Sequence, residues 1–298
     1  MKMPPKTSPK TKFSEDDVEL INDLVTIYDM VTHAKKGGKR IGVVPTMGAL
    51  HEGHLSLVRY AKEHCDFVVV TIFVNPTQFG EGEDLDKYPR PIENDLELLE
   101  KLDVDVAFCP QHSEMYPDGF STYVQPPEIS RPLEGTFRKS HFQGVATIVL
   151  KLFQLVPADE AFFGQKDYQQ TLVVRRMVDD LNVPIKTVVC PIHREADGLA
   201  MSSRNVYLND DDRSRATIIN RILCDIESKI INGNLEFEKL VAEGKTKLAE
   251  EVDSVDYLQV VDSETLLVPN SDTSKVVALA AVHIGGTRLI DNRIISLR

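Results

Sequence analysis

Residues 67–74 form an almost uninterrupted apolar run that is rich in β-branched side chains. Such a run is typical of a strand buried on both faces of a parallel sheet, because neither face needs polar residues for solvent. Comparable short runs, separated by segments with the apolar spacing of helices, occur at 41–44, 104–109, 161–163 and 185–190. This alternation predicts an α/β fold, in which a Rossmann-like parallel sheet is connected by right-handed helical crossovers.

The character of the sequence changes after Pro191. A polar loop is followed by helical and then strand-like patterns, at 210–231, 235–250, 255–262 and 276–283. Helices followed by strands are typical of an α+β unit, and 298 residues are many for one domain. We therefore expect a Rossmann-like N-terminal domain over residues 1–191 and a smaller α+β C-terminal domain over residues 192–298. Residues 1–13 are expected to be a disordered tail.

Four other segments give local predictions. Residues 14–36 are expected to form an opening helix that Ser14 caps, and residues 121–124 a short strand. Residues 142–156 are apolar on most helical faces, so we expect a helix buried either within its own domain or against another subunit. Residues 283–286 join two strand-like runs through Gly-Gly, which indicates a hairpin turn.

Composition limits the classes of function. The net charge of −12 argues against general binding of nucleic acid, which needs a basic face. The sequence contains no run of eighteen or more apolar residues, so no membrane span is predicted. The cysteines are far apart in sequence, which favours free thiols in a reducing, cytoplasmic compartment over disulfides; they are Cys65, Cys109, Cys190 and Cys224. Because the net charge is negative, an anionic substrate would have to be held by a local cluster of donors.

Two histidines, His51 and His54, follow the strand at 41–44 at the point where a helical pattern begins. Residues three apart near a helix start project to the same side, and the unpaired N–H groups of a helix N-terminus attract anions. Each imidazole ring adds a hydrogen-bond donor. The segment therefore fits a phosphate site that lacks a Walker lysine, and it fits equally well an ordinary turn with two surface histidines. Zinc is disfavoured, because a zincin needs His-Glu-x-x-His.

Polar residues also follow two other predicted strands. Together with residues 46–54, the segments 75–78 and 164–167 come at the carboxyl ends of strands. Ligands bind at that edge of an open parallel sheet, so we expect the three clusters to meet there. Their amide groups suit a polyol or a carboxylate, and the ammonium group of Lys166 suits phosphate.

Four strings, at 45–54, 72–79, 162–170 and 194–205, carry a closer resemblance. In these strings and in their order, the chain resembles the pantoate–β-alanine ligase family of the HIGH-motif nucleotidyltransferase superfamily. The resemblance implies a ligase of pantothenate and coenzyme A biosynthesis, with ATP as a substrate. Pantoate would attack the α-phosphate to give pantoyl adenylate and pyrophosphate, and β-alanine would then displace AMP. It also implies Mg²⁺ on the phosphates, a homodimer, and a C-terminal domain that acts as a lid.

The resemblance further implies roles for individual residues. The catalytic residues would be His51, His54 and Lys166. ATP would contact these three and also Met47, Gly48, Gly164, Gln165, Asp167, His193, Met201, Ser202, Ser203 and Arg204. Pantoate and β-alanine would contact Asn75, Gln78 and Gln170, with Met47 and Phe73 as an apolar wall. The candidate metal ligand is Asp95.

Two positions depart from the family pattern. Asn94 stands where the family often has an acidic residue near the metal, which leaves Asp95 as the candidate ligand. His193 stands where the family commonly has a small apolar residue, and the resemblance assigns its side chain no role.

Two alternative functions follow from the same residues. One is a nucleotide adenylyltransferase of the same superfamily, although such enzymes usually lack the amide pair Gln78 and Gln170. The other is an ATP-binding module without catalysis, which the intact set of histidines, Lys166 and residues 202–204 disfavours.

Overall fold

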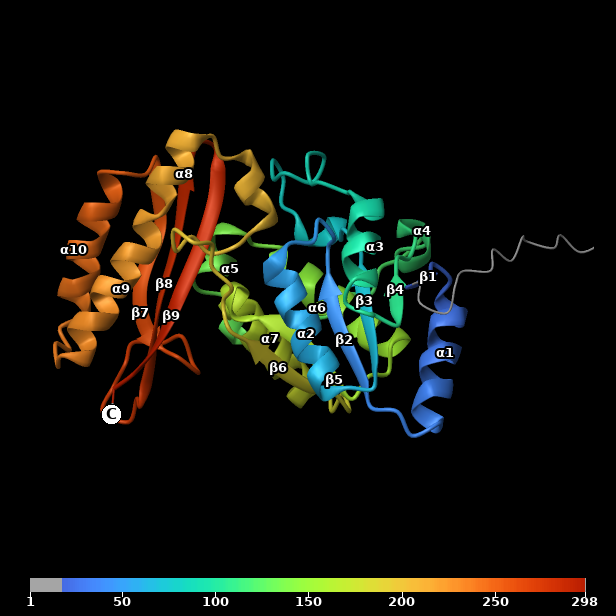
Figure 1. Ribbon diagram of the computed structural model, residues 1–298. Helices are drawn as coiled ribbons and strands as arrows, with labels where there is room; N and C mark the ends of the chain where they lie inside the picture. The colour runs from blue at the N-terminus through green and yellow to red at the C-terminus, as the bar shows by residue number, and fades with distance from the viewer. Residues whose placement is uncertain (1–17, 298) are drawn as a thin grey trace, which may run out of the picture.

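Six of the short strands form one parallel sheet in the computed structural model, which describes residues 18–297. Their order across the sheet is β1 (Glu19–Ile21), β4 (Val106–Phe108), β3 (Phe67–Ile72), β2 (Ile41–Thr46), β5 (Glu160–Gly164) and β6 (Lys186–Cys190). A separate antiparallel sheet of three strands follows in the chain. The predicted fold class is thereby confirmed. We call the two parts the N-terminal and C-terminal lobes, which lie side by side (Figure 1).

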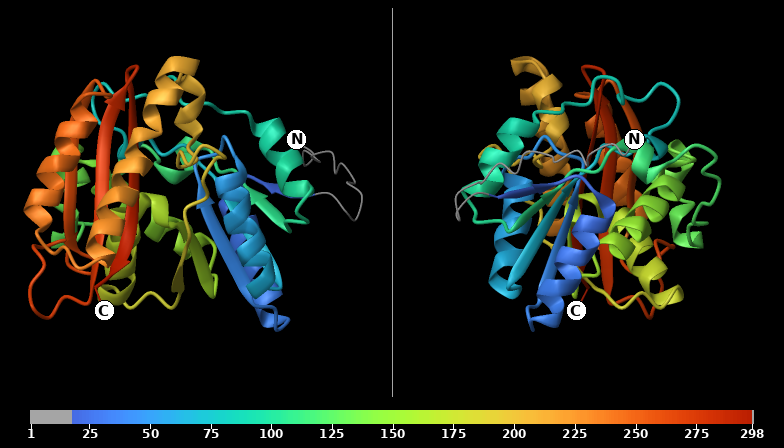
Figure 2. Two further views of the ribbon diagram at one scale, coloured as in Figure 1. Left: turned by 60° about the vertical axis from the view of Figure 1, so that its left-hand side comes forward. Right: turned by 90° about the vertical axis from the view of Figure 1, so that its right-hand side faces the viewer.

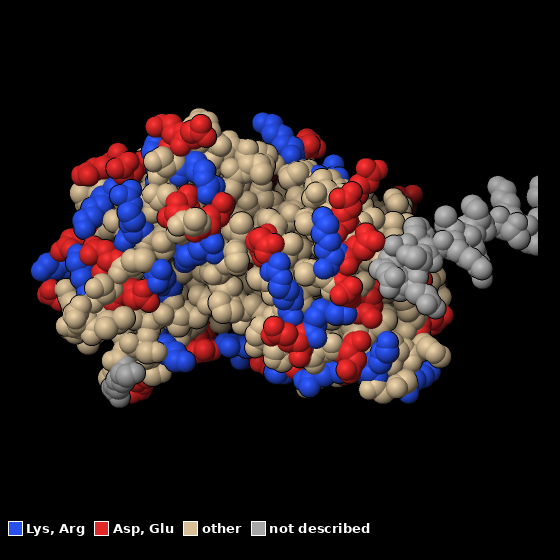
Figure 3. Space-filling view, viewed as in Figure 1, with Lys and Arg blue, Asp and Glu red and all other residues tan. Residues whose placement is uncertain are grey.

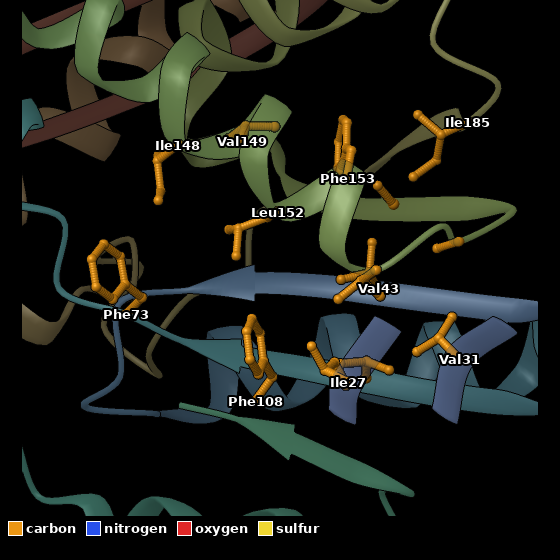
Figure 4. Packing of buried hydrophobic residues seen from close by; sticks show 14 of the residues in the cluster. Ile27, Val31, Val43, Phe73, Phe108, Ile148, Val149, Leu152, Phe153 and Ile185 are labelled. Atoms are coloured by element: carbon orange, nitrogen blue, oxygen red, sulfur yellow. The ribbon is translucent and has the colours of Figure 1, made fainter. Parts of the chain in front are cut away.

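The strands of the parallel sheet are buried on both faces, as their composition predicts. Val43 packs into a core with one group of helices, whereas the next residue, Val44, packs into a second core on the opposite face. The first group consists of α1 (Leu24–Lys36), α6 (His141–Leu155) and α7 (Tyr168–Asp180). The second consists of α2 (Glu52–His64) and α3 (Ile92–Glu100). Figure 4 shows Val43 facing Leu152 and Phe153 of α6 across the first core.

The C-terminal lobe places its antiparallel sheet between two layers. The strands are β7 (Ser254–Asp262), β8 (Lys275–Ile284) and β9 (Thr287–Ser296), and α9 (Ile218–Ile231) and α10 (Phe237–Ala249) cover the outer face. The helix predicted over 210–231 is interrupted at Thr217, so that α8 (Asp210–Ala216) precedes α9. The inner face packs against Leu133, Tyr168 and Leu172 of the N-terminal lobe. Figure 2 shows these neighbouring lobes from two further directions.

Short elements connect the larger ones. They are η1 (Pro76–Gln78), α4 (His112–Met115), η2 (Glu128–Ser130), α5 (Glu134–Phe137), η3 (Gln165–Asp167) and η4 (Ser203–Tyr207). Three of them, η1, η3 and η4, carry residues that the sequence assigned to the site.

The predicted opening helix is partly wrong. Glu19–Ile21 is a strand that pairs in parallel with Val106–Phe108 at the edge of the sheet. The helix begins only at Leu24, where Asp23 caps it by accepting a hydrogen bond of 2.7 Å from the N–H of Thr26. Pairing with a distant strand therefore overrides the helical spacing of this segment. The proposed cap Ser14 and the tail at 1–13 lie outside the described residues.

The other local predictions have mixed outcomes. Residues 121–124 are not a strand, since Val124 donates its N–H to the side chain of Thr147 and not to a sheet. The apolar helix α6 buries ten of its fifteen residues within this chain, so burial in the lobe accounts for its composition. The hairpin is confirmed, because Ile284 pairs with Thr287 around the two glycines.

The topology places a switch point between β2 and β5. The chain moves from β2 outward to β3 and β4, and later returns to add β5 and β6 on the other side of β2. Crossovers on the two sides of a switch point diverge, which leaves a crevice at the carboxyl ends of the central strands. The loops after β2, β3 and β5 all border this crevice.

Gly144 of α6 sets how closely this helix approaches the loop after β3. A Cβ atom on Gly144 would lie 2.3 Å from the carbonyl oxygen of Thr77 and 2.6 Å from the amide nitrogen of Gln78. We expect Gly144→Ala to lower the free energy of unfolding by about 2 kcal/mol, because overpacking against backbone outweighs the gain in helix propensity. Urea denaturation measures this change. Gly80→Ala is the matched control, since its Cβ would lie no closer than 3.4 Å to any atom, and equal stabilities of the two variants would contradict the prediction.

Candidate active site

A cavity of about 200 Å³ lies at the carboxyl ends of the central strands. It is lined by the loops that follow β2, β3 and β5, and by the segment that enters the C-terminal lobe. Most of the residues predicted from the sequence line it, namely Met47, His51, His54, Phe73, Asn75, Gln78, Gly164, Lys166, Asp167, Gln170, His193, Met201, Ser202, Ser203 and Arg204. Gly48, Gln165 and Asp95 do not line it.

His51 is held in one tautomer by the start of α2. It is the N-cap residue, and its Nδ1 accepts a hydrogen bond of 3.1 Å from the N–H of Gly53. An accepting Nδ1 carries no proton, so the neutral ring has its proton on Nε2. A Cβ atom at position 53 would lie 2.8 Å from Cε1 of His51, so glycine at this position leaves room for the ring.

His54 lies beside His51, with the ring centroids 4.1 Å apart. Its Nδ1 is buried and has no hydrogen-bond partner within the described part of the chain. Burial holds the pKa of His54 well below its ordinary value, and nearby His51 and Lys166 lower this pKa further. Burial and Lys166 likewise lower the pKa of His51 to about 4. Both imidazoles are therefore neutral at pH 7.

Lys166 supplies a positive charge that faces these two neutral rings. Its Nζ lies 3.9 Å from the Oδ1 of Asp167, too far for a short ion pair. The loop that carries Lys166 is fixed by Asn292 of β9, whose side-chain amide donates to the carbonyl oxygens of Gln165 and Lys166 at 2.9 and 3.0 Å. The C-terminal lobe thus positions a loop of the N-terminal lobe.

The side-chain amides of Asn75 and Gln78 differ in whether they remain available to bind a ligand. Asn75 is 1% exposed, and its side chain bonds to Gly144, Tyr116 and Gln78. Gln78 borders the cavity, and its Nε2 contacts the Sδ of Met47 at 3.2 Å. Thioether sulfur is a weak acceptor, so a stronger acceptor can replace it.

The segment 202–204 reaches back from the C-terminal lobe to the N-terminal lobe. Ser203 donates its hydroxyl to the carbonyl oxygen of Ala49 at 3.1 Å. Arg204 makes a bidentate ion pair with Asp84, with distances of 2.8 and 2.7 Å. This segment closes one wall of the cavity.

Three predicted residues have other surroundings. Asp95, the candidate metal ligand, accepts the N–H groups of Ala49 at 2.9 Å and Leu50 at 2.7 Å, one with each carboxylate oxygen. It therefore fixes the loop before α2 and does not line the cavity, and its role as a metal ligand stays a prediction. The side chain of Gln165 points to the C-terminal lobe, where it donates to Asn292 at 3.0 Å. Gly48 borders a different cavity, on the far side of Met47.

Several residues that line the cavity were missed from the sequence, among them Arg138 and His141. Arg138 follows the last residue of α5 and His141 is the first residue of α6, in a part of the sequence without clear periodicity. The available signal was a pair of polar residues three apart where an almost wholly apolar helix begins.

A second cavity, of about 690 Å³, adjoins the first between the lobes. The two cavities share Arg138, Lys166, Asp167, Ser202 and Arg204. Ligand sites for molecules of nucleotide size measure about 300–1,000 Å³, so such a ligand would extend into this second space. Over the face shown in Figure 3, cationic and anionic side chains are interspersed, so the positive charge at the site is local.

Metal-ligating clusters and membrane-spanning helices are both absent from the part of the chain that the structure describes. Between residues 18 and 297, no three His, Cys, Asp or Glu side chains gather in a way that could hold a metal ion. No helix in this range is long and apolar enough to cross a membrane.

The chain is similar to proteins of known families over nearly its whole length. Residues 19–294 match the model of the pantoate-beta-alanine ligase family. A pantothenate synthetase of Rhodopirellula baltica is 55% identical over 87% of this chain and 92% of its own length. A pantothenate synthetase of Thermus thermophilus has a similar structure, with a TM-score of 0.87 and 42% identity over 93% of this chain and 99% of that one.

A pantoate-beta-alanine ligase of Francisella tularensis was solved in complex with beta-gamma ATP and beta-alanine. Its TM-score to this chain is 0.79 and its identity 36%, over 93% of this chain and 97% of that one.

The lowered pKa of His51 makes stability depend on pH in a defined direction. Between its folded pKa of about 4 and its ordinary value of 6.5, the unfolded chain binds a proton at His51 that the folded chain does not. The free energy of unfolding therefore falls as pH falls through this window. The variant His51→Asn keeps a side-chain oxygen for the helix cap but cannot titrate at this position. Its free energy of unfolding should therefore fall less steeply with pH, by a slope that corresponds to at most one bound proton. Urea unfolding at pH 4.5, 5.5 and 7.5 measures both slopes, and identical slopes would contradict the assignment.

Proposed function

The chain belongs to the pantoate–β-alanine ligase family, and from this premise we propose how its residues perform the reaction. The enzyme condenses (R)-pantoate with β-alanine to pantothenate, with ATP as co-substrate. The reaction class is acid–amine ligation, which forms AMP and pyrophosphate. We propose that the cavity at the end of β2 and β5 holds the reacting groups, and that the interlobe cavity holds the remainder of the nucleotide.

In the first step, a carboxylate oxygen of pantoate attacks the α-phosphorus of ATP. The bond from this phosphorus to the bridging oxygen breaks, and pyrophosphate leaves with the electron pair. Such a transfer needs little covalent chemistry from the protein and depends on positioning and charge stabilisation. In our proposal, His51 and His54 donate hydrogen bonds to phosphate oxygens, and Lys166 stabilises the negative charge that develops on them.

The observation that carries this assignment is the buried Nδ1 of His54, which lacks a partner among the described residues. A buried polar atom without a hydrogen bond is costly, so its presence beside a cavity suggests a ligand that completes it. Phosphate oxygens accept hydrogen bonds, and the neutral ring of His51 offers an N–H from Nε2 to the same acceptors. Bound phosphate would also raise the pKa of both histidines, because it favours the charged ring.

In the second step, the amine of β-alanine attacks the acyl carbon of pantoyl adenylate. The bond between this carbon and the phosphate oxygen breaks, AMP leaves with the electron pair, and the amine loses a proton to solvent. We propose that Gln78 and Gln170 hold the hydroxyl and carboxyl groups of pantoate, with Met47 and Phe73 as the apolar wall. Residues 202–204 then shield the acyl adenylate from water by closing over it.

We propose that Mg²⁺ arrives as the complex with ATP. The described residues offer no preformed set of metal ligands, and each oxygen of Asp95 already accepts one backbone N–H group. Mg²⁺ binds phosphate oxygens readily and retains several waters, so few protein ligands are needed. The rate should then follow the concentration of the Mg²⁺–ATP complex when Mg²⁺ is titrated at fixed ATP.

We further propose a cytoplasmic homodimer in which residues 192–298 form the lid. The four free thiols support a reducing compartment. The end of β6 at Cys190 and the separate core of the C-terminal lobe support a boundary at residue 191. Light scattering would report twice the chain mass of 33.4 kDa for a dimer.

The proposal is tested by ATP–pyrophosphate exchange that depends on pantoate. Lys166→Ala should slow this exchange about 10- to 100-fold, as expected for the loss of a charge-assisted hydrogen bond of about 1.5–3 kcal/mol. Lys245→Ala, on the exposed side of α10, is the matched control and should exchange at the wild-type rate.

Two results would count against the proposal. A wild-type rate of the Lys166→Ala variant would show that this ammonium group does not act on the phosphates. Exchange that proceeds without pantoate would favour the nucleotide adenylyltransferase alternative.

A further inference from the structure

His141 and Arg138 line the cavity together with Gln78, and the proposed reaction assigns these two residues no role. Their contacts define the protonation of the imidazole ring. Nδ1 of His141 lies 2.8 Å from the carbonyl oxygen of Gln78, which can only accept, so Nδ1 carries the proton. Nε2 of His141 lies 3.3 Å from Nη1 of Arg138, which can only donate, so Nε2 accepts.

The carbonyl oxygen of Gln78 receives two donors. The first is the ring of His141, and the second is Nη2 of Arg138 at 3.3 Å. Two donors on one carbonyl oxygen restrict the orientation of its peptide plane, and with it the direction in which the side chain of the same residue leaves the backbone. The side chain of Gln78 extends to Met47, on the wall of the cavity.

Arg138 is itself held on several sides. Glu83 accepts hydrogen bonds from Nε and Nη2 of Arg138 at 2.8 and 2.7 Å. The side chain of Arg138 is only 15% exposed. Glu134 lies 3.8 Å away and makes a bidentate ion pair of 2.7 Å with Arg288 of the C-terminal lobe. The guanidinium therefore has little freedom to leave His141.

Burial and the neighbouring Arg138 lower the pKa of His141 to about 4. The ring thus remains neutral over the physiological range, which keeps Nε2 available as the acceptor for Arg138. His141 is 8% exposed, so the surrounding protein covers most of the ring.

We propose that His141, locked by Arg138, is a positioning residue that aims the amide of Gln78 at pantoate. The inference rests on the proposed contact between Gln78 and this substrate. His141 acts through the peptide of Gln78 and not on the reacting atoms. Loss of its Nδ1 donor should therefore weaken the binding of pantoate and leave the binding of ATP unchanged.

A pair of amide substitutions separates the two ring nitrogens. In His141→Asn, the side-chain nitrogen can occupy the place of Nδ1 and donate to Gln78. In His141→Gln, the longer side chain places its nitrogen near Nε2 and leaves the carbonyl without this donor. Both substitutions introduce a neutral, polar side chain, so we expect them to affect folding to a similar extent. Thermal unfolding verifies that each variant is folded.

We expect His141→Gln to raise the KM for pantoate about 10-fold, with the KM for ATP within twofold of wild type. His141→Asn should keep the KM for pantoate within about threefold. His64→Gln is the matched control, since the Nδ1 of His64 also contacts a backbone carbonyl, that of Tyr60 at 2.7 Å, on the exposed side of α2. This control should leave both KM values unchanged.

A double-mutant cycle identifies the path of the effect. If His141 acts through Gln78, the KM for pantoate of the double variant with His141→Gln and Gln78→Ala should equal that of Gln78→Ala alone. Three results would overturn the inference. The first is a KM for pantoate of the double variant in which the effects of the two single substitutions multiply. The others are equal rises of this KM in His141→Asn and His141→Gln, or a parallel rise in the KM for ATP. An unchanged KM for pantoate in Gln78→Ala alone would instead refute the proposed role of Gln78 itself.

Discussion

The structure depends on the burial of β2 on both of its faces. Val43 and Val44 point into opposite cores, so helices must cover both sides of the sheet. Parallel strands buried in this way require crossover connections, and crossovers on the two sides of β2 run in opposite directions from it. The crevice between β2 and β5 is a direct consequence. The loops that carry His51 and Lys166 border this crevice because each follows one of these strands.

The C-terminal lobe contributes to the site by direct contact. Asn292 holds the carbonyl groups of the loop that carries Lys166, and Ser203 and Arg204 contact the loops that carry Ala49 and Asp84. The lobes are also joined by the ion pair between Glu134, which is buried, and Arg288, which is partly buried. A buried ion pair adds little stability once desolvation is counted, but its bidentate geometry fixes orientation. The lobes are thereby set in one relative orientation at the site.

Charge at the site is distributed unevenly for a chain whose net charge is −12. Burial keeps the imidazoles of His51 and His54 neutral, as the lowered pKa of each shows. Neutral donors can contact phosphate without the desolvation cost of buried cations. Lys166 supplies positive charge, while Arg138 and Arg204 are each paired with a carboxylate. This arrangement suits a site that must bind a polyanion and later release it.

The sequence alone determined the fold class and most of the candidate site. The apolar run at 67–74 and its neighbours determined the buried parallel strands, because local patterning decides which faces are apolar. His51, Gln78 and Lys166 could be grouped because each follows such a strand. The lining residues Arg138 and His141 could not be found in this way, since they come from a segment without periodicity.

Only the tertiary structure decided what distant residues do to one another. Residues 19–21 have helical spacing but form a strand, because they pair with residues 106–108. Nothing in the sequence indicates that the carboxylate of Asp95 binds the N–H groups of the loop before α2. Gln165 follows a strand, as Lys166 does, yet its side chain donates to Asn292 and does not line the cavity. Spacing along a chain fixes which strand end a residue follows, whereas the partner of its side chain depends on contacts with residues that are far away in the sequence.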